Sequence, residues 1–372
     1  MKLTKTISAL AIVVALAISG CSKSDNPIDD SKPAPPVSNN YPKPKNLTEM
    51  SGLLTIAIKA FTNTVYFDMS AMNVADNQIE ITASNAYNNV INNDASLKYA
   101  YQVVSIYNKN AKVLKCDIKY MPYKLGIDPN TVPTSTKKVN SYNDLITAVS
   151  SSPLGQDIPI AITNKNLDFN TMQLVLGNQC GYGYIVHSFN ADATTVKSAP
   201  APMGLPGAPT GMNDCISRIN AIKDSVNHIL ARIITPGMTN DQKLTAVYNY
   251  VTPALYDFSY NTPNLNFDSQ TALGVFKNKL AVCGGFSWAF YMLANAAGVQ
   301  CYNVGGSAGA TPIGHAWSMA NYNGGYFYFD ATWDRGRTFS NYSYFAKTEA
   351  YFLQNLHTWN NTMINALVTE KL

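Results

Sequence analysis

The sequence predicts a protein of mixed helix and strand, with an N-terminal α/β region at 46–198 and a second folded region at 213–372. Hydrophobic residues make up 46% of the 372 residues, which is enough for a sizeable core and excludes a mostly disordered chain. A Pro/Gly-rich linker at 199–212 separates the two regions. The later region combines an apolar helix that follows a cysteine with a hairpin signal at 323–324.

Charge excludes one class of function. Charged residues make up 13% of the chain, against about 25% in a typical soluble protein. The net charge is +4, and no stretch is densely basic. Because nucleic-acid binding depends on clustered positive charge, we expect no nucleic-acid partner.

Residues 1–20 are predicted to be an export signal. Lys2 and Lys5 precede the apolar run 7–18, which is too short to span a bilayer comfortably. Small residues then precede Cys21, in a pattern that resembles the lipobox of bacterial lipoproteins. We therefore expect a lipid anchor at Cys21 and a location in the bacterial cell envelope, either periplasmic or surface-exposed. An ordinary secretory signal is the alternative.

Residues 21–45 are predicted to be a tether. This segment is rich in Pro, Ser and Asp, a composition that favours extended chain and cannot bury a core. The sequence leaves open which membrane and which leaflet would hold the anchor.

The region 46–198 alternates helical and strand-like patterns. Its first helix begins with Asn46 and Glu49, which are spaced as in a capping box. The order of elements is similar in its two halves, which indicates two small α/β repeats unless the similarity is due to chance. His187 lies in a strand pattern and is interpreted as structural. The role of the region, as scaffold, substrate-docking or occluding element, stays open. The predicted helices are 47–61, 76–91, 141–149 and 168–177, and the predicted strands are 65–69, 99–107, 158–162 and 182–186.

The region 213–372 is predicted to open with two helices. Isoleucine and valine recur at helical spacing from about 214 to 233. Thr239 and Gln242 then have the spacing of a capping box for the second helix.

Cys283 is predicted to lie at or just before the N-terminus of a helix. The run 286–297 contains strong helix formers, and Gly298 is a natural residue to end them. At a helix N-terminus, the peptide dipoles and free N–H groups favour a thiolate. Gly284 and Gly285 allow close approach, and backbone N–H groups there could face a developing oxyanion.

The Asn-Gly pair at 323–324 is a strong hairpin signal. A two-residue type I′ turn would place His315 opposite Thr332 and Trp317 opposite Asp330, all on one face of the hairpin. His315 and Asp330 would then be diagonal neighbours, with Cβ atoms ~7–8 Å apart. A loop longer by one residue would place them on opposite faces.

Three sequence segments together resemble the transglutaminase-like superfamily, the papain-related group of thiol enzymes. They are Val-Cys-Gly-Gly-Phe-Ser at 282–287, His-Ala-Trp at 315–317 and Tyr-Phe-Asp-Ala-Thr-Trp-Asp at 328–334. The resemblance covers roughly 239–360. It implies an α+β fold in which the helix of the cysteine packs against an antiparallel sheet that bears the histidine and the aspartate.

If folding brings them together, the three residues form a catalytic triad. Cys283 would attack an amide carbonyl and form a thioester, His315 would accept and return the proton, and Asp330 would orient the ring.

Further residues are assigned to the oxyanion site or the cleft. The two tryptophans either line the cleft or merely pack the sheet. We expect no cofactor and no metal, because no acidic loop matches the calcium sites of the animal enzymes. The candidate oxyanion and cleft residues are Gly284, Tyr256, Trp317 and Trp333.

The chemistry leaves several functions open. A thioester resolved by water defines a cysteine protease or a deamidase, and one resolved by an amine defines a transglutaminase. Because the bacterial relatives look more like proteases, we favour hydrolysis of a protein or peptide substrate. Two further hypotheses are a non-catalytic surface binding protein on the same fold, and an N-terminal region that binds a polymer or protein for the later domain to process.

Four other cysteines and one histidine receive no role. His357 lies at a position that is similar to one in the family, but it is interpreted as structural. An exported protein permits disulfides with three alternative pairings, none of which the sequence selects. These cysteines are Cys116, Cys180, Cys215 and Cys301.

Overall fold

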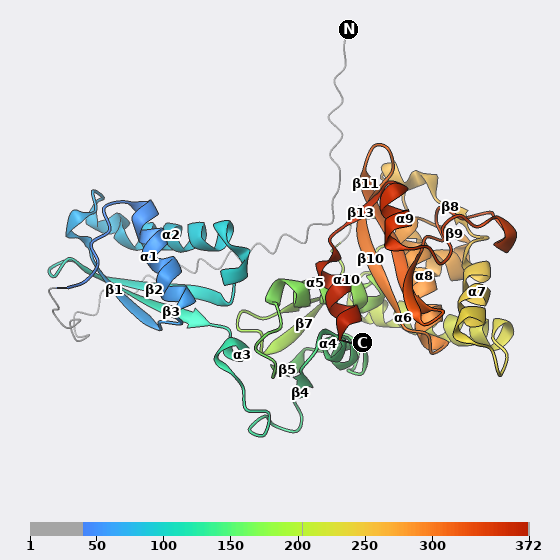
Figure 1. Ribbon diagram of the computed structural model, residues 1–372, viewed down its shortest axis with the longest axis horizontal. Helices are drawn as coiled ribbons and strands as arrows, with labels where there is room; N and C mark the ends of the chain where they lie inside the picture. Colours follow the sequence, from blue (N-terminus) through green and yellow to red (C-terminus); the bar gives the residue numbers. More distant parts are fainter. Residues whose placement is uncertain (1–39, 203, 371–372) are drawn as a thin grey trace, which may run out of the picture.

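The computed structural model describes residues 40–202 and 204–370. The predicted export signal, the lipid anchor at Cys21 and most of the predicted tether lie outside these residues. The described residues form three units, and Figure 1 shows the first of them to one side of the other two. No helix within 40–202 or 204–370 has the length and apolarity needed to cross a bilayer.

The first unit is a three-stranded antiparallel sheet with two helices. Its strand order is β1-β3-β2. The side chain of Asn46 accepts a hydrogen bond from the Glu49 N–H and so begins α1, and Met50, Leu54 and Ile58 of that helix are buried. The elements are α1 (Leu47–Lys59), β1 (Thr64–Asp68), α2 (Ile79–Asn93), β2 (Ala100–Asn108) and β3 (Val113–Tyr120).

The second unit is a mixed sheet with strand order β4-β5-β7-β6, in which β4 and β5 are parallel. This topology differs from that of the first unit, so the two halves of 46–198 are not copies of one topology. The elements are α3 (Pro122–Leu125), β4 (Lys137–Val139), α4 (Tyr142–Ser150), β5 (Ile158–Ile162), α5 (Phe169–Gln179), β6 (Ile185–Phe189) and β7 (Thr195–Pro200).

One detail of the second unit differs from the prediction, and a second agrees with it. The strand predicted at 182–186 begins only at Ile185, because Gly181–Gly183 form a 3₁₀ turn in which Tyr182 has φ 57°. His187 is buried in β6 beside the Ser198 hydroxyl, and burial lowers its pKa to about 4. These surroundings agree with a structural histidine.

The third unit is built on a four-stranded antiparallel sheet with strand order β12-β11-β10-β13. The capping box predicted at Thr239 and Gln242 is confirmed. The elements are α6 (Met212–Ile233), α7 (Asn240–Val251), β8 (Leu255–Tyr256), β9 (Leu280–Ala281), α8 (Cys283–Ala296), β10 (Cys301–Ala308), β11 (Ile313–Tyr322), β12 (Gly325–Phe329), α9 (Glu349–Gln354), β13 (His357–Trp359) and α10 (Asn361–Thr369).

Both faces of this sheet are covered. Cys301, Ala320 and Phe329 share a core with α6, α7 and α8. Because side chains alternate along a strand, the neighbouring residues face the other way. Tyr302 and Met319 share a second core with α4, α5 and α10. The second unit therefore packs on the face of the sheet that carries Tyr302 and Met319. The boundary predicted at 199–212 consequently does not separate two independent cores.

A hydrogen-bonded chain of side chains connects the second unit to α8. Gln179, at the end of α5, bonds both the N–H and the C=O of Asn303 in β10, at 2.9 and 2.7 Å. The Asn303 side chain accepts a 2.7 Å bond from the Ser287 hydroxyl, and the same hydroxyl lies 2.7 Å from the Trp317 carbonyl oxygen in β11. Ser287 lies one turn after Cys283, so these contacts fix where α8 begins.

The predicted two-residue turn of the hairpin is confirmed, but the strand ladder that follows it is shorter than predicted. Tyr322 pairs with Gly325, and the two turn residues have φ values of 50° and 77°. The ladder ends at Ser318 opposite Phe329, so the predicted pairing of His315 with Thr332 does not form. The chain leaves the ladder because the Asp330 side chain accepts hydrogen bonds from the next N–H groups and turns it.

Candidate active site

Cys283 is the first residue of α8. Val282 precedes it in extended conformation and offers no side-chain cap to the helix. A Cβ atom on Gly285 would lie 2.5 Å from the Ser269 carbonyl oxygen, so the first turn needs glycine to fit against this segment. The first backbone amides of α8 therefore have no side-chain cap, and the Cys283 residue is partly exposed.

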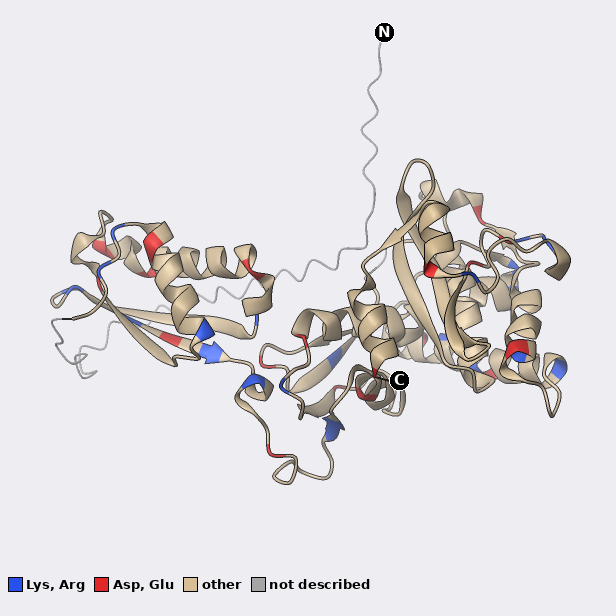
Figure 2. Cartoon of the chain, in the orientation of Figure 1, with Lys and Arg blue, Asp and Glu red and all other residues tan. Residues whose placement is uncertain are grey.

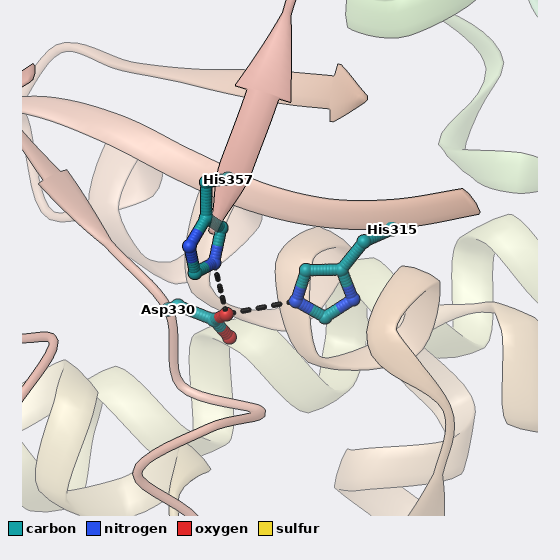
Figure 3. Close-up of side chains that lie close together, drawn as sticks. All are labelled: His315, Asp330 and His357. Atoms are coloured by element: carbon teal, nitrogen blue, oxygen red, sulfur yellow. Dashed lines mark hydrogen bonds and ion pairs between the residues drawn. The ribbon is translucent and has the colours of Figure 1, made fainter. Parts of the chain in front are cut away.

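His315 and Asp330 are in direct contact. His315 lies near the start of β11, and Asp330 follows the last residue of β12. The His315 Nε2 lies 2.8 Å from the Asp330 Oδ2, and the other ring nitrogen points away from the carboxylate (Figure 3). The diagonal proximity predicted from the turn is thus confirmed, although the strand pairing does not extend so far.

The carboxylate of Asp330 is fully buried and accepts four hydrogen bonds. Its Oδ1 accepts from the N–H groups of Thr332 and Trp333, at 2.9 and 3.1 Å. Its Oδ2 accepts from His315 and from His357. A buried charge without such partners would cost several kcal/mol, so these donors make an ionised Asp330 tolerable.

Electrostatics couple the three predicted triad residues. Burial lowers the pKa of His315, but the charge and hydrogen bond of Asp330, with a further hydrogen bond and charge interaction from Cys283, outweigh it and raise the pKa to about 10. Burial raises the pKa of Asp330, and the two histidines more than offset this and hold it well below its usual range. His315 therefore interacts with both the thiol and the carboxylate.

His357 is a second histidine on the same carboxylate. Its Nε2 lies 3.1 Å from the Asp330 Oδ2, and its Nδ1 lies 2.9 Å from the Asn355 carbonyl oxygen. Both oxygens can only accept, so each bond requires an N–H on the ring. From the sequence, His357 is interpreted as structural despite its family-like position, because its local pattern does not indicate that β13 joins the sheet beside β10.

The predicted cleft residues lie in different surroundings. Trp317 is 1% exposed and packs against Phe352, so its position favours the packing alternative. Trp333 is partly exposed and lies over His315 and His357, with ring centroids 5.8 and 4.4 Å apart. It therefore forms part of the wall around the histidines.

Tyr256 and Gly284 both lie beside Cys283. Tyr256 pairs with Ala281, two residues before the cysteine. Burial, and after it the charge of Cys283, raise the pKa of Tyr256. A Cβ atom on Gly284 would lie 3.1 Å from the carbonyl oxygen and 3.4 Å from the Oε1 of Gln270. Gln270 is thus a neighbour of the nucleophile position that the sequence pattern did not indicate, since it lies in a short 3₁₀ segment without periodicity.

Three side chains of the candidate site are of residue types that bind metal ions. His315, Asp330 and His357 each offer one ligand atom, and these atoms all lie within 4.8 Å of one another. In the observed arrangement, however, both Nε2 atoms face the same carboxylate oxygen and act as donors to it. The geometry therefore fits a hydrogen-bonded site better than a cation, which would need deprotonated nitrogens.

The other described cysteines differ from Cys283 in burial. All are unpaired and buried, whereas the Cys283 residue is partly exposed. Burial raises the pKa of Cys116 to about 11 and that of Cys180 to about 12, and it also raises the pKa values of Cys215 and Cys301. These thiols are therefore poor nucleophiles at neutral pH.

Residues 227–331 match the model of the transglutaminase-like superfamily. This range contains Cys283, His315 and Asp330. The chain therefore carries a transglutaminase-like domain, as the resemblance of the sequence predicts. A comparison with curated proteins finds no match.

Solved structures with similarity to the chain include three with low sequence identity. A proposed cysteine protease from Cytophaga hutchinsonii is 18% identical over 30% of this chain and 37% of its own, with a TM-score of 0.25. A TGase is 15% identical over 59% and 64%, with a TM-score of 0.27. A proposed protease from Parabacteroides distasonis is 10% identical over 61% and 52%, with a TM-score of 0.22. The chain thus spans less than two thirds of each of these structures.

The raised pKa of His315 predicts a pH-dependent stability. A group whose pKa rises from 6.5 to about 10 on folding stabilises the folded state fully below its unfolded value and loses that effect as the pH rises through its folded value. We expect the difference in unfolding free energy between the wild type and His315→Gln to be largest near pH ~6 and to shrink toward pH ~10. Urea denaturation at a series of pH values measures it, and a difference that stays constant would contradict the coupling.

The contact between His357 and Asp330 predicts a cost for its removal. His357→Phe fills much of the same space but leaves a buried carboxylate one donor short, so we expect a loss of about 1–3 kcal/mol in unfolding free energy. His357→Gln can still offer an N–H and should lose less. His228→Phe, on the exposed side of α6, is the matched control. Equal stability of the His357→Phe variant and the wild type in urea denaturation would refute this role.

Proposed function

We propose that the transglutaminase-like domain is a cysteine peptidase that hydrolyses amide bonds of a protein or peptide. The observation that carries the proposal is that the His315 ring interacts with both Asp330 and Cys283. One nitrogen is held by Asp330, while the ring also interacts with Cys283. A ring that is held by an acid and also interacts with a thiol is suited to general base catalysis.

The proposed reaction begins with proton transfer from the Cys283 thiol to His315. The Cys283 sulfur attacks the amide carbon, and the pair of electrons of the carbonyl moves to its oxygen. The C–N bond then breaks, and the His315 imidazolium gives its proton to the leaving amine. Water, deprotonated by His315, hydrolyses the thioester, which releases a carboxylic acid and restores the thiol.

The raised pKa of His315 supports the acid step. At neutral pH it draws the thiol proton onto the ring, so the first proton transfer favours a thiolate–imidazolium pair, and the imidazolium then supplies this proton to the amine. Backbone amides at the start of α8 have no side-chain cap and support the proposed stabilisation of the oxyanion. The same thioester could react with an amine, so amine transfer and deamidation are the outcomes against which hydrolysis is tested.

The proposal predicts the products of the enzyme. The mature chain is incubated with a peptide library, with and without a primary amine, and mass spectrometry identifies cleaved, deamidated and amine-adducted peptides. We expect cleaved peptides, and we expect Cys283→Ala to lower the rate at least about 10³-fold.

Two controls accompany this assay. Cys180→Ala removes a buried thiol in the second unit and should leave the activity intact. Amine adducts in place of cleavage would favour a transglutaminase, and undiminished turnover by Cys283→Ala would exclude the proposed nucleophile.

We also propose that the protein is a lipoprotein of the bacterial cell envelope. The lipobox-like sequence that ends at Cys21 and the Pro-rich composition of 21–45 support this. In this arrangement the lipid would hold the enzyme at a membrane and the tether would keep the folded units away from it.

The lipoprotein proposal predicts a membrane-bound protein whose anchor depends on one residue. We expect the wild type in the membrane fraction and in the detergent phase of a Triton X-114 extraction. Cys21→Ser should block lipid attachment, so the variant should no longer incorporate labelled palmitate. A soluble wild type, or a labelled Cys21→Ser variant, would contradict the anchor.

A further inference from the structure

Arg335 lies at the edge of the candidate active site and bonds few groups among the described residues. A guanidinium has five N–H donors. Within the described residues, Arg335 makes one side-chain hydrogen bond, from Nη1 to the Thr332 carbonyl oxygen at 2.8 Å, and no ion pair. By contrast, Arg218 pairs with Asp214 and Asp268, and Arg337 pairs with Asp334.

Two segments of the site hold Arg335 in place. The turn that starts at Asp330 carries it, and its bond to Thr332 ties it to that turn. On the other side, its guanidinium lies over the rings of Tyr256 and Phe258, 5.0 and 5.9 Å from their centroids. Tyr256 pairs with the strand that leads into Cys283. The cation therefore connects the segment of the nucleophile with the segment of the acid.

Exposed aromatic rings continue this surface. Phe258 is 73% exposed and Tyr260 is 40% exposed, and both rings lie edge-on to Tyr256 at 5.2 and 5.8 Å. Figure 2 colours few positions of the described chain as charged, and the described cations that lie over aromatic rings include Arg335. Aromatic rings hold a guanidinium in position and leave its N–H edge available to a planar anion.

We propose that Arg335, with Tyr256 and Phe258, forms a subsite that binds a carboxylate of the substrate next to the amide attacked by Cys283. This assignment rests on the proposed function and narrows its substrate class to acidic peptides. The guanidinium matches a carboxylate by two parallel N–H···O bonds, a geometry that a single ammonium group cannot supply. The exposed rings would contact the apolar part of the same residue or of its neighbour.

The subsite can be tested without any peptide turnover. Iodoacetate and iodoacetamide alkylate the same thiol and differ in that iodoacetate carries a carboxylate. We compare their second-order rates at Cys283 by mass spectrometry and take the iodoacetate-to-iodoacetamide ratio. We expect Arg335→Gln to lower this ratio about fivefold, the effect of one charge at short range in water, and 1 M salt to reduce the difference.

Two matched variants accompany the measurement. Arg232→Gln removes one positive charge from the exposed end of α6 and should leave the ratio unchanged. Arg335→Lys keeps the charge and should retain most of the iodoacetate preference, which separates charge from folding. Thermal unfolding of each variant confirms that the fold is intact. An unchanged ratio in a folded Arg335→Gln variant would overturn the subsite.

Peptide pairs then identify the source of the carboxylate. The two peptides of one pair have either Glu or Gln beside the cleaved bond. The two peptides of the other pair have either a free or an amidated C-terminus. We expect kcat/KM to favour the acidic member of one pair in the wild type and to lose that preference in Arg335→Gln. Equal rates for both members of both pairs would overturn the subsite. A failure to cleave any peptide would count against the proposed function instead, while the alkylation ratio still decides on Arg335.

Discussion

The active-site arrangement depends on one buried charge, the carboxylate of Asp330. A carboxylate with no exposed surface is stable only when its oxygens accept enough hydrogen bonds. Its four donors come from the turn that follows it, from β11 and from β13. Satisfying this charge therefore fixes the end of β12, the orientation of His315 and the position of β13 at once (Figure 3).

The register of the sheet explains how His357 in β13 contacts Asp330, which follows β12. β13 and β12 are the two edges of the sheet, separated by β10 and β11. His357 pairs with Ala308, and His315 pairs with Gly306, so all four lie on the same face. A Cβ atom on Gly306 would lie 2.7 Å from the Trp317 ring. The small residues of β10 thus leave room for the aromatic rings that surround the two histidines.

The local parts of the site could be predicted from the sequence, because they depend on residues close together in the chain. The start of α8 at Cys283 follows from helix formers that end at Gly298, and the contact between His315 and Asp330 follows from the parity of an Asn-Gly turn. The positions of His357 and Gln270 could not be predicted, because contacts between distant segments of the chain bring them to the site. Arg335 is close to Asp330 in the chain, but its contacts with Tyr256 and Phe258 are long-range and could not be predicted either. The end of the ladder was also missed, since it depends on a side chain that competes with backbone pairing.

Long-range packing also gives the second unit, which precedes the transglutaminase-like match in the chain, a structural role. Helix α8 packs on the face of the sheet opposite to that of Trp317, while the second unit covers the Trp317 face. Through Gln179, Asn303 and Ser287, the second unit is hydrogen-bonded across the sheet to the helix that carries Cys283. Residues 121–200 are therefore a structural part of the transglutaminase-like half, because removing them would expose the Trp317 face of the sheet and release the contacts that set where α8 begins.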